Sequence, residues 1–112
     1  MQKFVIVGGN RLKGTIRASG SKNATLPILA ASILNAGKST ICEAPQLRDV
    51  SVMKDVLSYL GAKIVSDRST IEVDSSTIQS VEITEELMRR MRASNLVLGS
   101  LLGRFGRVRI SY

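Results

Sequence analysis

Lys22 and Asn23 are the residues of this sequence best placed to do chemistry. They follow a Ser-Gly-Ser break at residues 19–21 and open an apolar run over residues 23–34. The first turn of a helix leaves backbone N–H groups unbonded and carries the positive end of the helix dipole, so it attracts anions. A lysine at that position adds a full positive charge. The residues alone fit two interpretations: an anion-binding site, or a capped helix start with a lysine that faces solvent.

The sequence offers few other groups for acid–base or metal chemistry. It contains no histidine, which is the commonest general acid–base residue and the commonest zinc ligand. Cys42 is the single cysteine, so no disulfide forms within the chain and a reducing compartment is expected. Cys42 lies in an expected strand ahead of Pro45, and we interpret it as an ordinary buried small residue rather than a nucleophile. We expect no metal site.

The charge balance favours an anionic partner without identifying one. The 112 residues include 16 Lys and Arg against 9 Asp and Glu, a formal net charge of +7. The basic residues are scattered and only 4% of the residues are aromatic, which argues against a nucleic-acid tail or a base-stacking surface. The longest apolar run, residues 26–31, is far shorter than the roughly 20 residues that cross a bilayer, and no signal-peptide pattern opens the chain. We therefore expect a cytoplasmic protein that binds neither nucleic acid nor membrane.

The elements that must position the lysine–asparagine pair begin with two expected strands. Residues 4–9 are rich in β-branched side chains and end in two glycines, and residues 12–18 alternate apolar and polar side chains. The helix expected over residues 23–34 is apolar all round, so we expect it to be buried on most sides. Pro27 is expected in its first turn, where a missing N–H group costs least.

The rest of the chain alternates between strands and helices. An amphipathic helix is expected from Asp49 to Leu60, where apolar residues recur at i, i+3, i+4 and i+7 before Gly61 ends the pattern. Thr84 opens another helical region with two glutamates in its first turn, as the helix dipole favours. The remaining expected elements are strands at residues 39–42, 62–65, 70–73 and 107–111, and a helix through residues 96–102.

Two stretches of the sequence repeat when residue 24 is laid over residue 93. Residues 24–41 and 93–110 then share four identities, and both read as a helix, a glycine, a basic residue and a strand. We therefore predict a repeat of roughly 70 residues, with a first unit over residues 1–80 and the start of a second over residues 81–112. The expected fold class is α+β. One unit cannot cover a helix that is apolar all round, so we expect the remainder of a larger enzyme or a neighbouring chain to cover it.

Three motifs carry a family resemblance. They are Gly-Ser-Lys-Asn-Ala-x-Leu-Pro-x-Leu-Ala-Ala at residues 20–31, Met-Arg-Ala-Ser at residues 91–94 and Gly-Arg-Phe-Gly at residues 103–106. Through them the chain closely resembles the UDP-N-acetylglucosamine enolpyruvyl transferases, and the resemblance covers essentially all 112 residues. It implies two lobes, each an inside-out α/β barrel made of three βαβαββ units whose helices pack inside.

The resemblance also implies an activity. Members move the enolpyruvyl group of phosphoenolpyruvate to the 3′-hydroxyl of UDP-N-acetylglucosamine and release phosphate, the first committed step of peptidoglycan synthesis, with no metal or organic cofactor. Their lysine–asparagine pair, which serves phosphoenolpyruvate, matches Lys22 and Asn23. Their Met-Arg-Ala-Ser arginine, which lies by the UDP-sugar, matches Arg92. Arg92 falls opposite Asn23 in the repeat, so the same helix-start position is expected to bind ligand twice.

The family's catalytic cysteine or aspartate lies in a loop that, by resemblance, would follow Tyr112. We therefore expect no catalytic residue within the chain, and we interpret it as an N-terminal piece that is inactive by itself. The nearest alternative is an enzyme like 5-enolpyruvylshikimate-3-phosphate synthase, which typically has Lys-Ser where this chain has Lys22 and Asn23. A basic nucleic-acid-binding module is the alternative from a different class.

Overall fold

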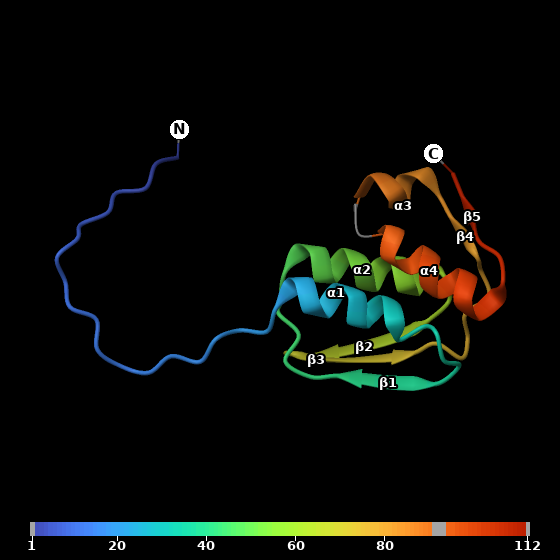
Figure 1. The fold of residues 1–112 in the computed structure, drawn as a ribbon, viewed down its shortest axis with the longest axis horizontal. Helices are drawn as coiled ribbons and strands as arrows, with labels where there is room; N and C mark the ends of the chain where they lie inside the picture. The colour runs from blue at the N-terminus through green and yellow to red at the C-terminus, as the bar shows by residue number, and fades with distance from the viewer. Residues whose placement is uncertain (1, 91–93, 112) are drawn as a thin grey trace.

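The computed structural model describes residues 2–90 and 94–111 of the chain. Figure 1 shows a layer of helices over a three-stranded sheet, with a long extended arm at the N-terminus. The helices are α1 (Lys22–Ala31), α2 (Arg48–Tyr59), α3 (Glu85–Arg90) and α4 (Ser94–Phe105), and the strands are β1 (Lys38–Ile41), β2 (Lys63–Asp67), β3 (Thr70–Asp74), β4 (Glu82–Ile83) and β5 (Arg109–Ile110). These elements confirm the expected α+β class.

The main sheet has β3 at its centre, antiparallel to β1 on one side and to β2 on the other. Side chains alternate along β3, so Ile71 and Val73 are buried while Glu72 is exposed. Gly61, with φ at 109°, lets the chain turn from α2 into β2, and a side chain there would meet the carbonyl oxygen of Thr77 at 2.8 Å. A second sheet pairs β4 in parallel with β5.

The hydrophobic core lies between the helix layer and the main sheet. α1 packs against both α2 and α4, and α2 packs against β2. The helix α2 is amphipathic as predicted, with Met53, Val56 and Leu57 fully buried. The other large side chains without solvent exposure are Leu29, Ile33, Leu60, Val73, Ile83, Val97 and Leu101. Residues from both sides of the predicted unit boundary therefore share one core, and the division into units 1–80 and 81–112 stays a prediction.

The outer faces of α1 and α4 differ from the predicted burial on most sides. Ile28 in α1 is 50% exposed and Leu34 just after it is 51% exposed, while Leu96 and Leu102 in α4 are 42% and 53% exposed. The main sheet covers one side of the helix layer (Figure 1), and these four side chains remain about half exposed although Leu34 lies beside Gly103 of α4. The side that faces the sheet is buried as predicted, and the cover of the outer side by further protein stays a prediction.

The two strands predicted before α1 are not formed. Residues 2–20 contain no helix or strand, and Phe4, Ile6 and Ile16 are 98%, 88% and 94% exposed. A β pattern becomes a strand only where another strand completes its backbone hydrogen bonds. No strand in the described part of the chain pairs with this arm. The prediction of strands at residues 4–9 and 12–18 is therefore wrong for this structure.

The other elements match the predicted ones within a few residues, with three differences. The helix α1 ends at Ala31 rather than near Leu34, and the short strand β4 was not predicted. Pro27 lies in the second turn of α1 rather than in the first. Because proline lacks an N–H group, the backbone carbonyl of Asn23 receives no helical hydrogen bond from residue 27.

Candidate functional site

Ser21 fixes where α1 begins. Its backbone is extended (φ −82°, ψ 126°), and its side chain accepts a hydrogen bond from the backbone N–H of Ala24 at 3.3 Å. Its carbonyl oxygen accepts from the backbone N–H of Thr25 at 2.9 Å and from the Thr25 hydroxyl at 2.8 Å. This cap makes Lys22 and Asn23 the first two helical residues, whose backbone N–H groups have no partner inside the helix.

Gly20 brings the start of α1 against the loop that leads into α2. A Cβ atom on Gly20 would lie 1.8 Å from the carbonyl oxygen of Glu43 and 3.3 Å from Cδ of Pro45. Any side chain at this position would force the two segments apart. Arg17, at the end of the arm, forms an exposed ion pair with Glu43 and adds a second contact between the same segments.

The contact between these segments places Lys22 next to Asp49. The Nζ atom of Lys22 donates a hydrogen bond to Oδ2 of Asp49 at 2.9 Å, although the two residues are 27 positions apart. Asp49 is the second residue of α2, and α1 and α2 run in the same direction, so both helix starts lie at the end where the arm enters (Figure 1). The side chains are 43% and 48% exposed, and an ion pair with that exposure stabilises a fold by only about 0–1 kcal/mol.

The sequence-predicted site residues have different outcomes. Lys22 and Asn23 are exposed in the first turn of α1, as both interpretations of the motif require. Arg92 lies outside the described residues. Asp49 was not predicted as a site residue, since the sequence analysis placed it only at the start of the expected amphipathic helix. The ligand roles of Lys22, Asn23 and Arg92 stay predictions.

Cys42 is exposed, which corrects the prediction that it is buried. The strand β1 ends at Ile41, whose side chain is buried, so the next side chain points the other way. Exposure alone does not make a thiol reactive, because reactivity depends on stabilisation of the thiolate by nearby positive groups.

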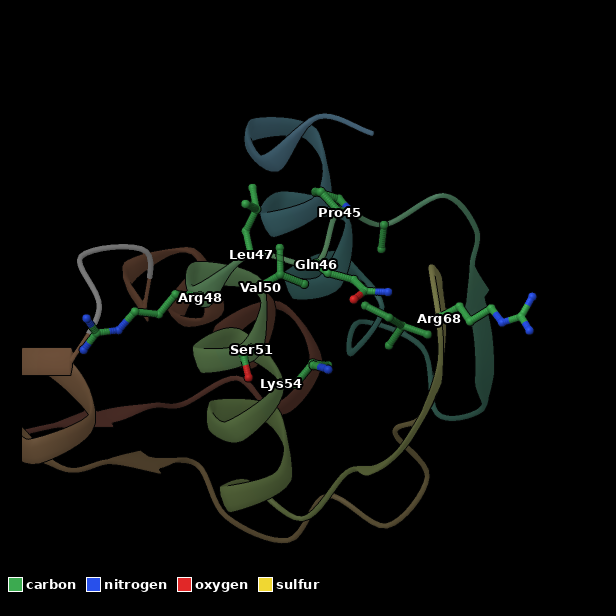
Figure 2. Close-up of a pocket in the computed structure, with 10 residues that line it drawn as sticks. Pro45, Gln46, Leu47, Arg48, Val50, Ser51, Lys54 and Arg68 are labelled. Carbon is green, nitrogen blue, oxygen red and sulfur yellow. The ribbon is translucent and has the colours of Figure 1, made fainter. Parts of the chain in front are cut away.

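A cleft of about 380 Å³ lies beside the start of α2 (Figure 2) and includes Arg48, Lys54 and Arg68 in its lining. Figure 2 shows the side chains of Arg48 and Arg68 extending to opposite sides, away from each other. Lys54 donates a hydrogen bond to Oγ of Ser66 at 3.2 Å. Because the three cations do not converge, this cleft lacks the geometry of an anion site, and neither Lys22 nor Asp49 lines it.

Two further kinds of site are not seen in the described part of the chain. Residues 2–90 and 94–111 contain no group of three or more His, Cys, Asp or Glu side chains that could hold a metal ion. Over the same residues, each helix is too short or too polar to span a bilayer.

Comparison with known proteins assigns the chain to a family. The family model for EPSP synthase (3-phosphoshikimate 1-carboxyvinyltransferase) matches residues 6–112. The chain belongs to this family. The UDP-N-acetylglucosamine 1-carboxyvinyltransferase of Trichlorobacter lovleyi is 50% identical over 111 residues, which are 99% of this chain and 26% of that relative. The protein of the same name from Coxiella burnetii is 50% identical over 112 residues, with the same shares.

A solved structure supports the same assignment. The crystal structure of the enolpyruvyl transferase NikO from Streptomyces tendae matches with a TM-score of 0.75 and 30% sequence identity, over 88% of this chain and 23% of that chain. The predicted resemblance and the enolpyruvyl transferase fold are thus confirmed. The chain spans only about a quarter of the length of the curated relatives it matches, at 26% for both of those named above.

Proposed function

We propose that the protein containing this chain transfers the enolpyruvyl group of phosphoenolpyruvate to the 3′-hydroxyl of UDP-N-acetylglucosamine and releases phosphate. The observation that carries the proposal is the pairing of an exposed lysine–asparagine motif with a helix start, in a chain that is 50% identical to relatives named for this reaction. By this proposal the protein acts in the first committed step of peptidoglycan synthesis, in the cytoplasm.

Lys22 is proposed to bind the anionic groups of phosphoenolpyruvate. Its ammonium group stands where unbonded N–H groups and the positive end of α1 already favour negative charge. The side-chain amide of Asn23 supplies both a donor and an acceptor at the next position. Arg92 is proposed to bind the UDP-sugar, and no metal or organic cofactor is proposed to take part.

The uncovered faces of α1 and α4 fit the same proposal. Both faces carry half-exposed leucine or isoleucine side chains, and the relatives named above are much longer than this chain. We propose that further parts of the same protein, or a neighbouring chain, cover these faces. Burying apolar side chains of this size is the usual basis for such contacts.

The alternative substrate is 3-phosphoshikimate, because it appears in the description of the matching family model. The Lys22–Asn23 pair argues against it, since the synthases that use shikimate 3-phosphate typically have serine at the second position. One measurement distinguishes the two possible acceptors: phosphate release from phosphoenolpyruvate in the presence of each. We expect release with UDP-N-acetylglucosamine and none with shikimate 3-phosphate.

The test of Lys22 uses the full-length protein that contains this chain. The variant Lys22→Ala should lower kcat/KM for phosphoenolpyruvate by ~10–100-fold, as expected for losing about 1.5–3 kcal/mol of charged hydrogen bonding. Its melting temperature should stay near that of the wild type, since the exposed pair with Asp49 adds little stability. Lys22→Arg should not restore activity, because a planar guanidinium does not overlay an ammonium group.

The matched control is Lys63→Ala, which removes an exposed lysine from β2 on the main sheet. This variant should keep wild-type kinetics. Wild-type kinetics in Lys22→Ala would instead support the interpretation of Lys22 as a solvent-facing residue, and the proposed roles of Asn23 and Arg92 would lose their main support.

A further inference from the structure

The ion pair between Lys22 and Asp49 joins two helix starts that are distant in the sequence. Its two atoms are 2.9 Å apart, and both side chains are about half exposed. Exposed pairs contribute little to the stability of a fold, so stability alone gives no reason to bring these two charges together. The geometry of the pair is therefore more informative than its energy.

The surrounding backbone holds this geometry. The close approach of Gly20 to the carbonyl oxygen of Glu43 fixes the start of α1 against the loop before α2. The cap by Ser21 fixes the helical position of Lys22, and the first turn of α2 fixes Asp49. Two rigid helix starts thus hold the backbone ends of two flexible side chains.

The chemistry of an ammonium group allows Lys22 to bind Asp49 and a ligand at once. The group has three N–H donors, and the hydrogen bond to Asp49 uses one of them. A lysine side chain is long and loses considerable rotamer freedom when it is held in one position. A partner that already restrains it removes part of that loss from the binding step.

We propose that Asp49 is a positioning residue that holds the Lys22 ammonium group at the start of α1, ready for an anionic ligand. This inference rests on the proposed function for the identity of the ligand, phosphoenolpyruvate. The competing explanation is that Asp49 serves α2 alone, as an acidic residue in the first turn of a helix whose N-cap Leu47 makes no side-chain cap hydrogen bond. The two explanations differ in whether the effect of Asp49 depends on Lys22.

The experiment is a double-mutant cycle in the full-length protein, with Lys22→Ala, Asp49→Ala and the double variant. We expect Asp49→Ala to raise KM for phosphoenolpyruvate roughly 5-fold with kcat much less changed, the size of a modest hydrogen-bond effect. In the double variant, kcat/KM should equal that of Lys22→Ala, because Asp49 has nothing left to position. Asp49→Asn, which keeps an acceptor oxygen, should recover part of the loss.

The control on the same helix is Asp55→Ala, which removes an exposed acidic residue from the middle of α2 and should leave KM unchanged. A loss in Asp49→Ala that is equally large in the Lys22→Ala background overturns the inference in favour of the role in α2 alone. Unchanged kinetics in Asp49→Ala overturns it as well.

A binding measurement separates this inference from the proposed function. Inorganic phosphate is titrated into the wild type and the same variants by calorimetry, with no turnover required. One outcome is a wild type that binds phosphate yet lacks the proposed activity. If phosphate affinity then falls in both single variants and falls no further in the double variant than in Lys22→Ala, the positioning role stands and the proposed function is wrong. If phosphate affinity depends on Lys22 but not on Asp49, or if the wild type does not bind phosphate, the positioning role is wrong.

Discussion

Two junctions of this chain each contain a cation from a helix, and the two cations make different contacts. At the starts of α1 and α2, Lys22 reaches Asp49 in a pair that is about half exposed on both sides. At the other end of α1, Arg104 of α4 donates through Nη1 to the carbonyl oxygens of Ile33 at 3.1 Å and Ser75 at 2.9 Å. Lys22 is thus paired with another exposed side chain, whereas Arg104 directs Nη1 at two backbone carbonyl oxygens.

The second junction is closed by a buried hydroxyl. Ser75 has no exposed surface, and its hydroxyl donates to the carbonyl oxygen of Asn35 and accepts from the backbone N–H of Gly37 at 3.4 Å. The carbonyl oxygen of Gly37 accepts from the backbone N–H of Ser75 at 2.9 Å. Buried backbone groups without partners are costly, so this network stabilises the turn from α1 to β1. The comparison teaches that the kind of acceptor matters: the partly buried Arg104 holds backbone groups of the fold, whereas the exposed Lys22 contacts only another exposed side chain.

The largest expected effect comes from Gly20→Ala, which would break the first junction. The added Cβ atom would overlap the carbonyl oxygen of Glu43, and overpacking of this kind costs about 1–3 kcal/mol of folding free energy. Because the shift also moves Lys22 away from Asp49, we expect kcat/KM to fall by roughly 100-fold, as small misplacements of binding groups can cause. Steady-state phosphate release and urea unfolding of the full-length protein measure the two effects.

The matched control for that variant is Gly37→Ala, in the second junction. A Cβ atom there would lie 3.6 Å from the side-chain nitrogen of Asn35, an ordinary contact distance. Its kinetics should match the wild type, and its unfolding free energy should change far less than in Gly20→Ala. Equal losses in the two variants would mean that the close approach at Gly20 has no special role.

The next largest effect is expected from Arg104→Ala, which breaks the second junction. Two carbonyl oxygens would lose charged donors, so the unfolding free energy should fall by about 1.5–3 kcal/mol. The kinetics of the folded protein should stay near wild type, because this cation is not offered to a ligand. Arg89→Ala, which removes only an exposed pair with Glu85, should cost at most about 0.5 kcal/mol. Similar unfolding free energies in the two variants would contradict the contrast between the junctions.

Local sequence patterns were enough to predict most of the helices and strands from α1 onward. The spacing of Met53, Val56 and Leu57 predicted α2, because that pattern expresses burial against one neighbouring layer. The strand predicted at residues 70–73 is β3, in which Ile71 and Val73 are buried. The prediction of strands in the N-terminal arm was wrong for the opposite reason. Its β-branched residues favour a strand, but a strand also needs a pairing partner, which local sequence does not specify.

The candidate site was predictable only in part. The motif at Lys22 follows from adjacent residues, since a Ser-Gly-Ser break before an apolar helix is a local signal. The contact between Lys22 and Asp49 joins residues 27 positions apart and depends on how α1 packs against α2. A single sequence does not specify that packing. Cys42 was predicted to be buried because free cysteines usually are, but it follows Ile41, the buried residue that ends β1, and is itself exposed.

The smallest expected effect concerns Asp74, whose charge lies on the open side of the main sheet. The Ser76 hydroxyl lowers the pKa of Asp74 most, followed by the Ser76 backbone N–H and then by the charges of Lys38 and Lys63, its neighbours on the two flanking strands. A lowered pKa in the folded state means that the ionised carboxylate favours folding. This contribution is present above the ordinary aspartate pKa of about 3.9 and is lost as the pH falls through the lowered value.

Carboxyl ¹³C NMR of Asp74 tests both the direction of this shift and its cause. The pKa should lie below the ordinary value in the wild type and should rise more in Ser76→Ala than in Lys38→Ala, because the hydroxyl is the largest contributor. A larger rise of the Asp74 pKa in Lys38→Ala would show that cross-strand charge, rather than the local hydrogen bond, controls this carboxylate. A wild-type pKa at or above the ordinary value would remove the acid-sensitive contribution to stability altogether.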